Sequence, residues 1–170
     1  MSDRLTSVSA DVERPVTHAA DLAADLAWAL ATRVHSTADD VAALVRAMSL
    51  DPTRVAVEYA YLLIVVTQFC IDAGVDAAHG REALGKAFES AARAVASLRA
   101  SDRGIQLRRH AYGDALANPH PEFGRAYSVG RVFARYCDAS HEVAVIDFGA
   151  RTYMEQLPPM LGRLRSVTVA

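Results

Sequence analysis

The residues His110 and Asp114 are the pair in this chain whose types and spacing best suit acid–base chemistry. Four residues apart on a helix, they would lie on one face, where the carboxylate can orient the imidazole ring. Their neighbours Arg108 and Arg109 make the segment electropositive. Because one His–Asp pair on a helix is common by chance, we expect an ordinary surface pair, and an enzyme that uses it ranks behind two other functions.

Glu58 is the only carboxylate between Asp51 and Asp72, near the start of a long apolar run. If this side chain were buried, its pKa would rise, and it could serve as a general acid or base. Arg54 precedes it by four residues, however, and an Arg–Glu pair at that spacing is an ordinary contact on the rim of a helix. We expect the ion pair with Arg54.

The motifs of metal, cofactor and nucleophile sites are missing from the sequence. None of the six histidines falls in an HxxxH, HExxH or ExxH pattern, so no helix face is preset to hold a metal. Cys70 and Cys137 are separated by 66 residues without a CxxC, which argues against a zinc site and against a disulfide scaffold. There is no GxSxG, GxxxxGK[ST] or GxGxxG. We expect no metal and no cofactor.

Charge is divided unevenly along the chain. Residues 1–98 carry 8 basic and 13 acidic groups, and residues 99–170 carry 10 basic and 7 acidic groups. A basic surface in the second half would suit an anionic ligand, an RNA backbone or an acidic protein surface. The plainer interpretation, which we favour, is a solvated face in salt bridges with the acidic first half. The candidate binding arginines are Arg108, Arg109, Arg125, Arg131 and Arg135.

Two further side chains are binding candidates. His120 stands between two prolines, so its backbone is stiff and its side chain is expected at a loop surface. Trp28 falls on a helix face that otherwise carries polar residues, where an aromatic ring either packs under another element or anchors a partner. We expect Trp28 to be covered from within the molecule, by the N-terminal arm.

The elements that must position these residues are helices. The chain contains 33 alanines, and its apolar residues recur at intervals of three and four. Residues 52–73 are apolar on nearly every face, which predicts a central helix enclosed by the others. We expect an all-α, bundle-like single domain of seven or eight helices over residues 16–170, after a flexible polar arm over residues 1–15. The other helices are expected at about 17–35, 38–48, 79–100, 101–117, 121–138 and 140–156, with a break at Pro158-Pro159 before a short terminal helix.

The sequence favours neither DNA nor a membrane as a partner. Residues 38–62 have a helix-turn-helix pattern, but the second helix offers Arg54 and then mostly hydrocarbon, so we expect no DNA binding through it. The longest uncharged run, Tyr59–Ile71, has 13 residues, against about 18–20 for a membrane span. The polar start of the chain lacks the apolar stretch of a signal peptide, so a cytoplasmic location is expected.

Three functions remain. The first is a non-catalytic protein–protein interaction module, such as an adaptor, an immunity-type or a regulatory protein, that acts through a helical surface and can form a homodimer. The second is a helical domain that binds a small apolar or anionic ligand between its helices, where Tyr61, Phe69, Tyr127 and Tyr136 could line an apolar pocket. The third is an enzyme that uses His110 and Asp114, assisted by Glu58 or His120.

Overall fold

The computed structural model describes residues 14–170, and most of them are helical. Seven α-helices follow one another in this range, with a 3-10 turn, η1 (Ala96–Leu98), between the fourth and the fifth. The predicted all-α fold class is therefore confirmed. The helices are α1 (Ala19–Ser36), α2 (Ala38–Met48), α3 (Pro52–Gly74), α4 (Ala78–Ala94), α5 (Asp102–Ala117), α6 (Gly124–Tyr136) and α7 (Val143–Arg165).

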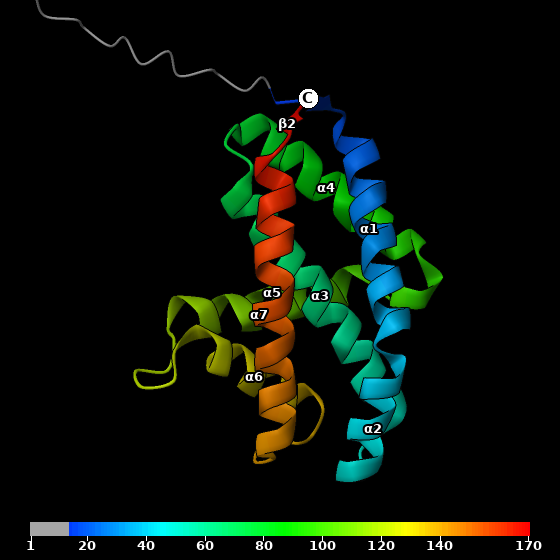
Figure 1. Cartoon of the computed structure of the whole chain (residues 1–170), viewed down its shortest axis with the longest axis vertical. Helices are drawn as coiled ribbons and strands as arrows, with labels where there is room; N and C mark the ends of the chain where they lie inside the picture. The colour runs from blue at the N-terminus through cyan, green and yellow to red at the C-terminus, as the bar shows by residue number, and fades with distance from the viewer. Residues whose placement is uncertain (1–13) are drawn as a thin grey trace, which may run out of the picture.

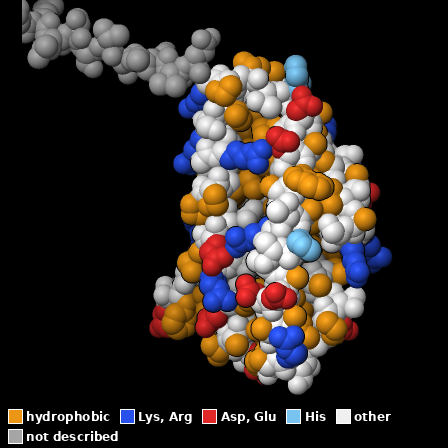
Figure 2. All heavy atoms as spheres, turned by 45° about the vertical axis from the view of Figure 1, so that its right-hand side comes forward, with side chains coloured by type: hydrophobic (Ala, Val, Ile, Leu, Met, Phe, Trp, Pro, Cys, Tyr) orange, Lys and Arg blue, Asp and Glu red, His pale blue; other side chains and the backbone are white. Residues whose placement is uncertain are grey.

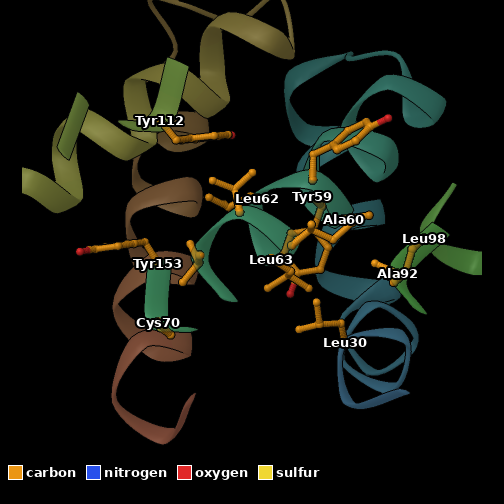
Figure 3. Packing of buried hydrophobic residues seen from close by; sticks show 14 of the residues in the cluster. Leu30, Tyr59, Ala60, Leu62, Leu63, Cys70, Ala92, Leu98, Tyr112 and Tyr153 are labelled. Atoms are coloured by element: carbon orange, nitrogen blue, oxygen red, sulfur yellow. The ribbon is translucent and has the colours of Figure 1, made fainter. Parts of the chain in front are cut away.

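Helix α3 is the centre of the fold, as its sequence predicted. It begins where the Asp51 carboxylate accepts hydrogen bonds from the backbone N–H groups of Thr53 and Arg54, at 2.8 and 3.0 Å. Every residue from 58 to 68 is buried. Figure 3 shows buried apolar side chains of α3 on both sides of the helix, with Leu62 on the side of Tyr112 and Leu63 on the side of Leu30.

By length and composition alone, α3 could also cross a membrane. Within the described residues, however, 78% of its most apolar 18-residue window is buried by the other helices. A helix that is apolar on all sides needs apolar neighbours on all sides, and α1, α4, α5, α6 and α7 supply them here.

The remaining helices are arranged around α3. Helix α1 packs on α4, and α7 packs on α6 and on α3. Helices α1 and α7 run along the long axis, and α3 passes between them (Figure 1). Two ion pairs join α1 to α7, from Arg33 to Glu155 and from Arg163 to Asp25, with N···O distances of 2.6 and 3.2 Å. Helix α5 lies against both α3 and α6, so its two long sides meet different surroundings.

Glycines set the close approach of α6 and α7. A Cβ atom added at Gly130 would overlap the backbone carbonyl of Ile146, and one added at Gly149 would lie 2.7 Å from the Cβ of Phe133. Without side chains at these points the two backbones can pack directly against each other. This contact fixes α6 in place, and with it the residues on its outer face.

The predicted break at Pro158-Pro159 is wrong, because α7 continues through both prolines to Arg165. Each proline leaves one carbonyl of the preceding turn without its helical donor. Those carbonyls belong to Met154 and Glu155, which are exposed, as are the prolines, so water can reach them. The other face stays apolar, and burial of Met160 and Leu164 holds the last turns against the core.

A short pairing of the two ends of the described chain was not expected from the sequence. Strand β1 (Val16–Thr17) pairs in parallel with β2 (Thr168–Val169), and the N–H of Ala19 donates to the carbonyl of Ala170 at 3.1 Å. Runs of two residues carry no readable periodicity, so these strands could not be predicted from the sequence. Most of the predicted arm, residues 1–13, lies outside the described residues, and the division into an arm and one helical domain stays a prediction.

Candidate functional site

Glu58 lies in the core and not on a helix rim. Its side chain is 1% exposed, its Oε1 accepts a hydrogen bond from the Tyr112 hydroxyl at 2.8 Å, and its Oε2 accepts one from the Arg108 Nε at 2.9 Å. The expected ion pair with Arg54 is wrong, because Glu58 faces α5 whereas Arg54 is exposed and pairs with Asp138. Glu58 therefore joins α3 to α5.

This buried carboxyl has an altered acidity. Burial raises the pKa of Glu58 from 4.5 to about 7, although Arg108 and Tyr112 act in the opposite direction. The guanidinium of Arg108 lies over the rings of Tyr61 and Tyr136, at 4.8 and 4.1 Å from their centroids. The group is thus enclosed by its own partners, and its geometry gives a substrate no access to the carboxyl.

His110 and Asp114 face away from that cluster. Arg108 and Tyr112 are one turn apart on the side of α5 that meets α3, and His110 is about 200° round the helix from Arg108. The imidazole Nε2 lies 3.4 Å from the Asp114 carboxylate, with the two side chains 82% and 66% exposed. The structure does not bring Glu58 to this pair, so the residues named for an enzyme share no cleft.

The thiols offer no alternative nucleophile. Cys70 and Cys137 are both buried, and burial raises the pKa of each to about 12. A thiol with so high a pKa remains protonated near neutral pH and is a poor nucleophile. Within residues 14–170, His, Cys, Asp and Glu side chains form no group of three or more that is placed to hold a metal.

His120 is half-buried in the turn between α5 and α6, where the sequence suggested a displayed side chain. Its Nδ1 accepts hydrogen bonds from the backbone N–H groups of Glu122 and Phe123, both at 3.3 Å. The ring stacks on Phe123, with the centroids 4.8 Å apart, and meets Tyr127 edge-on at 5.3 Å. His120 therefore organises the turn, and Phe123 is the ring that the turn exposes.

The five candidate arginines divide into two groups. Arg108 pairs with Glu58, and Arg109 pairs with Asp72 and Glu89 at 3.3 Å each, so these two do contact the acidic first half as expected. The three on α6 differ, since none of them has a carboxylate within ion-pair distance in the part of the chain that the structure describes. These are Arg125, Arg131 and Arg135.

Arg131 and Arg135 line an open groove between α5 and α6, with a volume of about 610 Å³. Asp114 and Asn118 lie on the α5 wall, and Ser140 closes the end beyond α6. The sequence singled out both arginines but not the groove, because the groove depends on how far α5 stands from α6. We take the groove as the candidate functional site.

A second groove, of about 650 Å³, lies between the α1–α2 corner and α7. Its walls carry charges of both signs, and Figure 2 shows acidic and basic side chains close together on this face. Arg33 and Glu155 already bind each other across it at 2.6 Å. Because Arg33 is already paired and Asp40 and Asp147 outnumber the remaining arginine, Arg151, this groove has less to offer an anionic ligand.

The sequence predicted that Trp28 is covered from within the molecule. The side chain is 72% exposed, however, so no described residue covers it. The arm that we expected to cover it lies outside the described residues, apart from Arg14 and Pro15. Three of the four aromatic residues proposed for an apolar pocket contact polar side chains instead, since Tyr61 and Tyr136 pack on Arg108 and Tyr127 contacts His120. An apolar hollow of about 240 Å³ lies elsewhere, between α1, α2 and α3, and is small for a ligand site.

Comparison with known proteins adds no family to these observations. The chain matches no protein-family model, no curated protein and no solved structure. The function must therefore be argued from the site itself.

Proposed function

We propose that this protein is a non-catalytic interaction module that binds an acidic segment of a partner protein in the groove between α5 and α6. The observation that carries the proposal is the contrast among the arginines. Arg108 and Arg109 are bound to carboxylates of the chain itself, whereas Arg131 and Arg135 line a groove and pair with none among the described residues. The Arg135 guanidinium also lies over the Tyr136 ring, 5.4 Å from its centroid, but that contact uses the face of the group. With no carboxylate at ion-pair distance in the described part of the chain, both arginines retain N–H donors for a carboxylate from outside.

The spacing of the two arginines supports the same proposal. Four residues apart on α6, they lie one helical turn apart on one face. Successive carboxylates of an acidic segment can meet such a pair, and the charged contact would also speed association. The Asn118 amide and the Ser140 hydroxyl also line the groove. Each can donate a hydrogen bond to the backbone of the segment or accept one from it.

Nucleic acid fits the site less well than an acidic peptide. Within residues 14–170, Arg131 and Arg135 are the only cationic side chains on the lining of the groove. Two arginines neutralise at most two phosphates, whereas the affinity of nucleic-acid binding proteins grows with the number of phosphates that they neutralise.

The proposal is tested with fluorescein-labelled hexaglutamate and fluorescence anisotropy in low salt. We expect Arg131→Glu with Arg135→Glu to weaken binding at least tenfold, because two attractive contacts become repulsive. Asp114→Asn should strengthen binding two- to fivefold, because it removes the one negative charge from the groove wall. The two variants therefore move the affinity in opposite directions.

The matched control is Arg46→Glu with Arg103→Glu, which makes the same change in net charge at exposed arginines that lie outside the groove and outside α6. This control should retain affinity within about twofold, and circular dichroism should show the same helix content in every variant. Equal weakening by the control, or no binding of hexaglutamate to the unmodified protein at millimolar concentration, would rule the proposal out.

A further inference from the structure

The face of α6 that carries the groove arginines continues into an aromatic surface. Phe123, Tyr127, Arg131 and Arg135 follow one another at intervals of four residues. Tyr127, Arg131 and Arg135 lie within α6, where each step of four advances about 6 Å along the helix and turns about 40° round it. Phe123 precedes the first residue of α6, Gly124, which has a φ of +72°, and it joins the other three through its ring, which lies 4.8 Å from that of Tyr127. The four side chains therefore form one row of roughly 17 Å, about 12 Å along the helix and one ring contact beyond it. We call these four residues the α6 stripe.

The aromatic end of the stripe is exposed but held in place. Phe123 is 59% exposed, and its ring lies 4.8 Å from both His120 and Tyr127, measured between centroids. His120 is in turn fixed by the backbone N–H groups of Glu122 and Phe123. An exposed ring that is already ordered loses little entropy on binding, which is typical of an anchor point for an apolar side chain.

One end of the α6 stripe is aromatic and the other is cationic. The distance between the two ends sets the length of a peptide that can contact both. An extended chain advances about 3.3 Å per residue, so about 17 Å corresponds to five or six residues. A segment of that length can place an aromatic or aliphatic side chain on Phe123 and two carboxylates on the arginines.

We infer that the α6 stripe recognises an extended segment of about six residues, with an aromatic or aliphatic residue at one end and two acidic residues at the other. This inference rests on the proposed function and adds the apolar anchor and the spacing to it. Arg131 and Arg135 supply the charge contacts, and Phe123, backed by Tyr127 and His120, supplies the apolar contact.

The test uses three labelled hexapeptides with the same two glutamates at one end. The first has phenylalanine at the other end and a glycine–serine spacer between, the second has alanine in place of the phenylalanine, and the third has the phenylalanine directly beside the glutamates. We expect the first peptide to bind about five- to tenfold more tightly than either of the others, since only it can reach both ends of the stripe.

Phe123→Ala should remove that advantage and leave the affinity for the alanine peptide unchanged. Trp28→Ala is the matched control, because it removes an exposed aromatic residue from α1, which lies outside the groove. It should leave all three affinities unchanged. An RNA hexamer of uridines, added as a competitor, should not displace the first peptide.

The outcomes distinguish a failure of this inference from a failure of the proposed function on which it rests. If the three peptides bind equally, or if Phe123→Ala has no effect, while the Arg131→Glu and Arg135→Glu variant still loses binding, the aromatic anchor is wrong and the acidic-segment function stands. If that arginine variant binds all three peptides as the unmodified protein does, both are wrong. Displacement by the uridine hexamer would replace the peptide with a single-stranded nucleic acid as the ligand and overturn the inference.

Discussion

At the scale of single residues, the carboxyl of Glu58 is the group whose environment departs furthest from that of an ordinary glutamate. It lies among apolar side chains with Arg108 and Tyr112 as its hydrogen-bond partners, and burial raises its pKa to about 7. Near neutral pH, then, part of the population holds this group protonated. A buried carboxyl of this kind makes the stability of the fold depend on pH.

The sign of that dependence follows from the raised pKa. Between pH 4.5 and pH 7 the folded chain holds a proton on Glu58 that the unfolded chain has released, so the free energy of unfolding falls as the pH rises through this window. The total decrease is about 3 kcal/mol at 1.36 kcal/mol per pKa unit. Urea unfolding at pH 5, 6, 7 and 8 measures it.

Glu58→Gln should abolish this slope, because the amide does not titrate. The exposed Glu142→Gln serves as the control and should keep the slope of the unmodified protein. A Glu58→Gln variant whose stability still falls between pH 5 and pH 8, in parallel with the control, would contradict the account of Glu58.

The sequence indicated part of this cluster. A lone carboxylate in a long apolar run marked Glu58 as unusual, and burial was one of the two interpretations that its position allowed. The partner could not be inferred, because Arg108 follows Glu58 by 50 residues and only the packing of α5 on α3 brings them together. The local spacing instead pointed to Arg54, which contacts Asp138.

At the scale of elements, the contact between α6 and α7 decides where the groove arginines stand. Gly130→Ala should destabilise the protein by about 2 kcal/mol, although alanine is the better helix former, because its Cβ would overlap the carbonyl of Ile146 and force the helices apart. Gly162→Ala is the control in α7, where a Cβ meets no atom within 4 Å. It should stabilise the protein by about 1 kcal/mol.

Thermal or urea unfolding of the two variants measures both effects. Because Gly130 faces α7, the first variant should also displace α6 and weaken hexaglutamate binding, whereas the second should not. Stabilisation by both alanines would mean that α6 and α7 are not in close contact at Gly130.

The spacing of apolar residues predicted most of the helices. It did not predict that α7 continues through two prolines, because that depends on whether this turn faces solvent. The bounds of α1, α2, α3 and α5 lie within about two residues of those predicted. In the structure, side chains of Asp51 and Ser101 accept backbone N–H hydrogen bonds at the starts of α3 and α5. Proline in α7 was taken as a break, but its cost depends on whether the freed carbonyls meet water. A sequence does not show which side of a helix will face solvent at one given turn.

At the scale of the whole molecule, the arginines of the basic second half of the chain have different roles. Some arginines of the second half bind carboxylates of the first half within the fold, as Arg109 binds Asp72 and Glu89. Arg131 and Arg135 instead line an open groove. The sequence predicted the excess of charge, but only the folded arrangement separates the arginines that hold the molecule together from those that can bind a partner. Homodimer formation stays a prediction, which light scattering can test.

The most direct test of the proposed binding site is a titration of the isotope-labelled protein with hexaglutamate, followed through its backbone amide signals by NMR. The account predicts that the largest shifts fall on residues 111–118 and 128–140, which contain the two walls of the groove, and that they vanish in the Arg131→Glu and Arg135→Glu variant. Shifts concentrated instead on the groove between the α1–α2 corner and α7, or small shifts spread evenly over the chain, would contradict it.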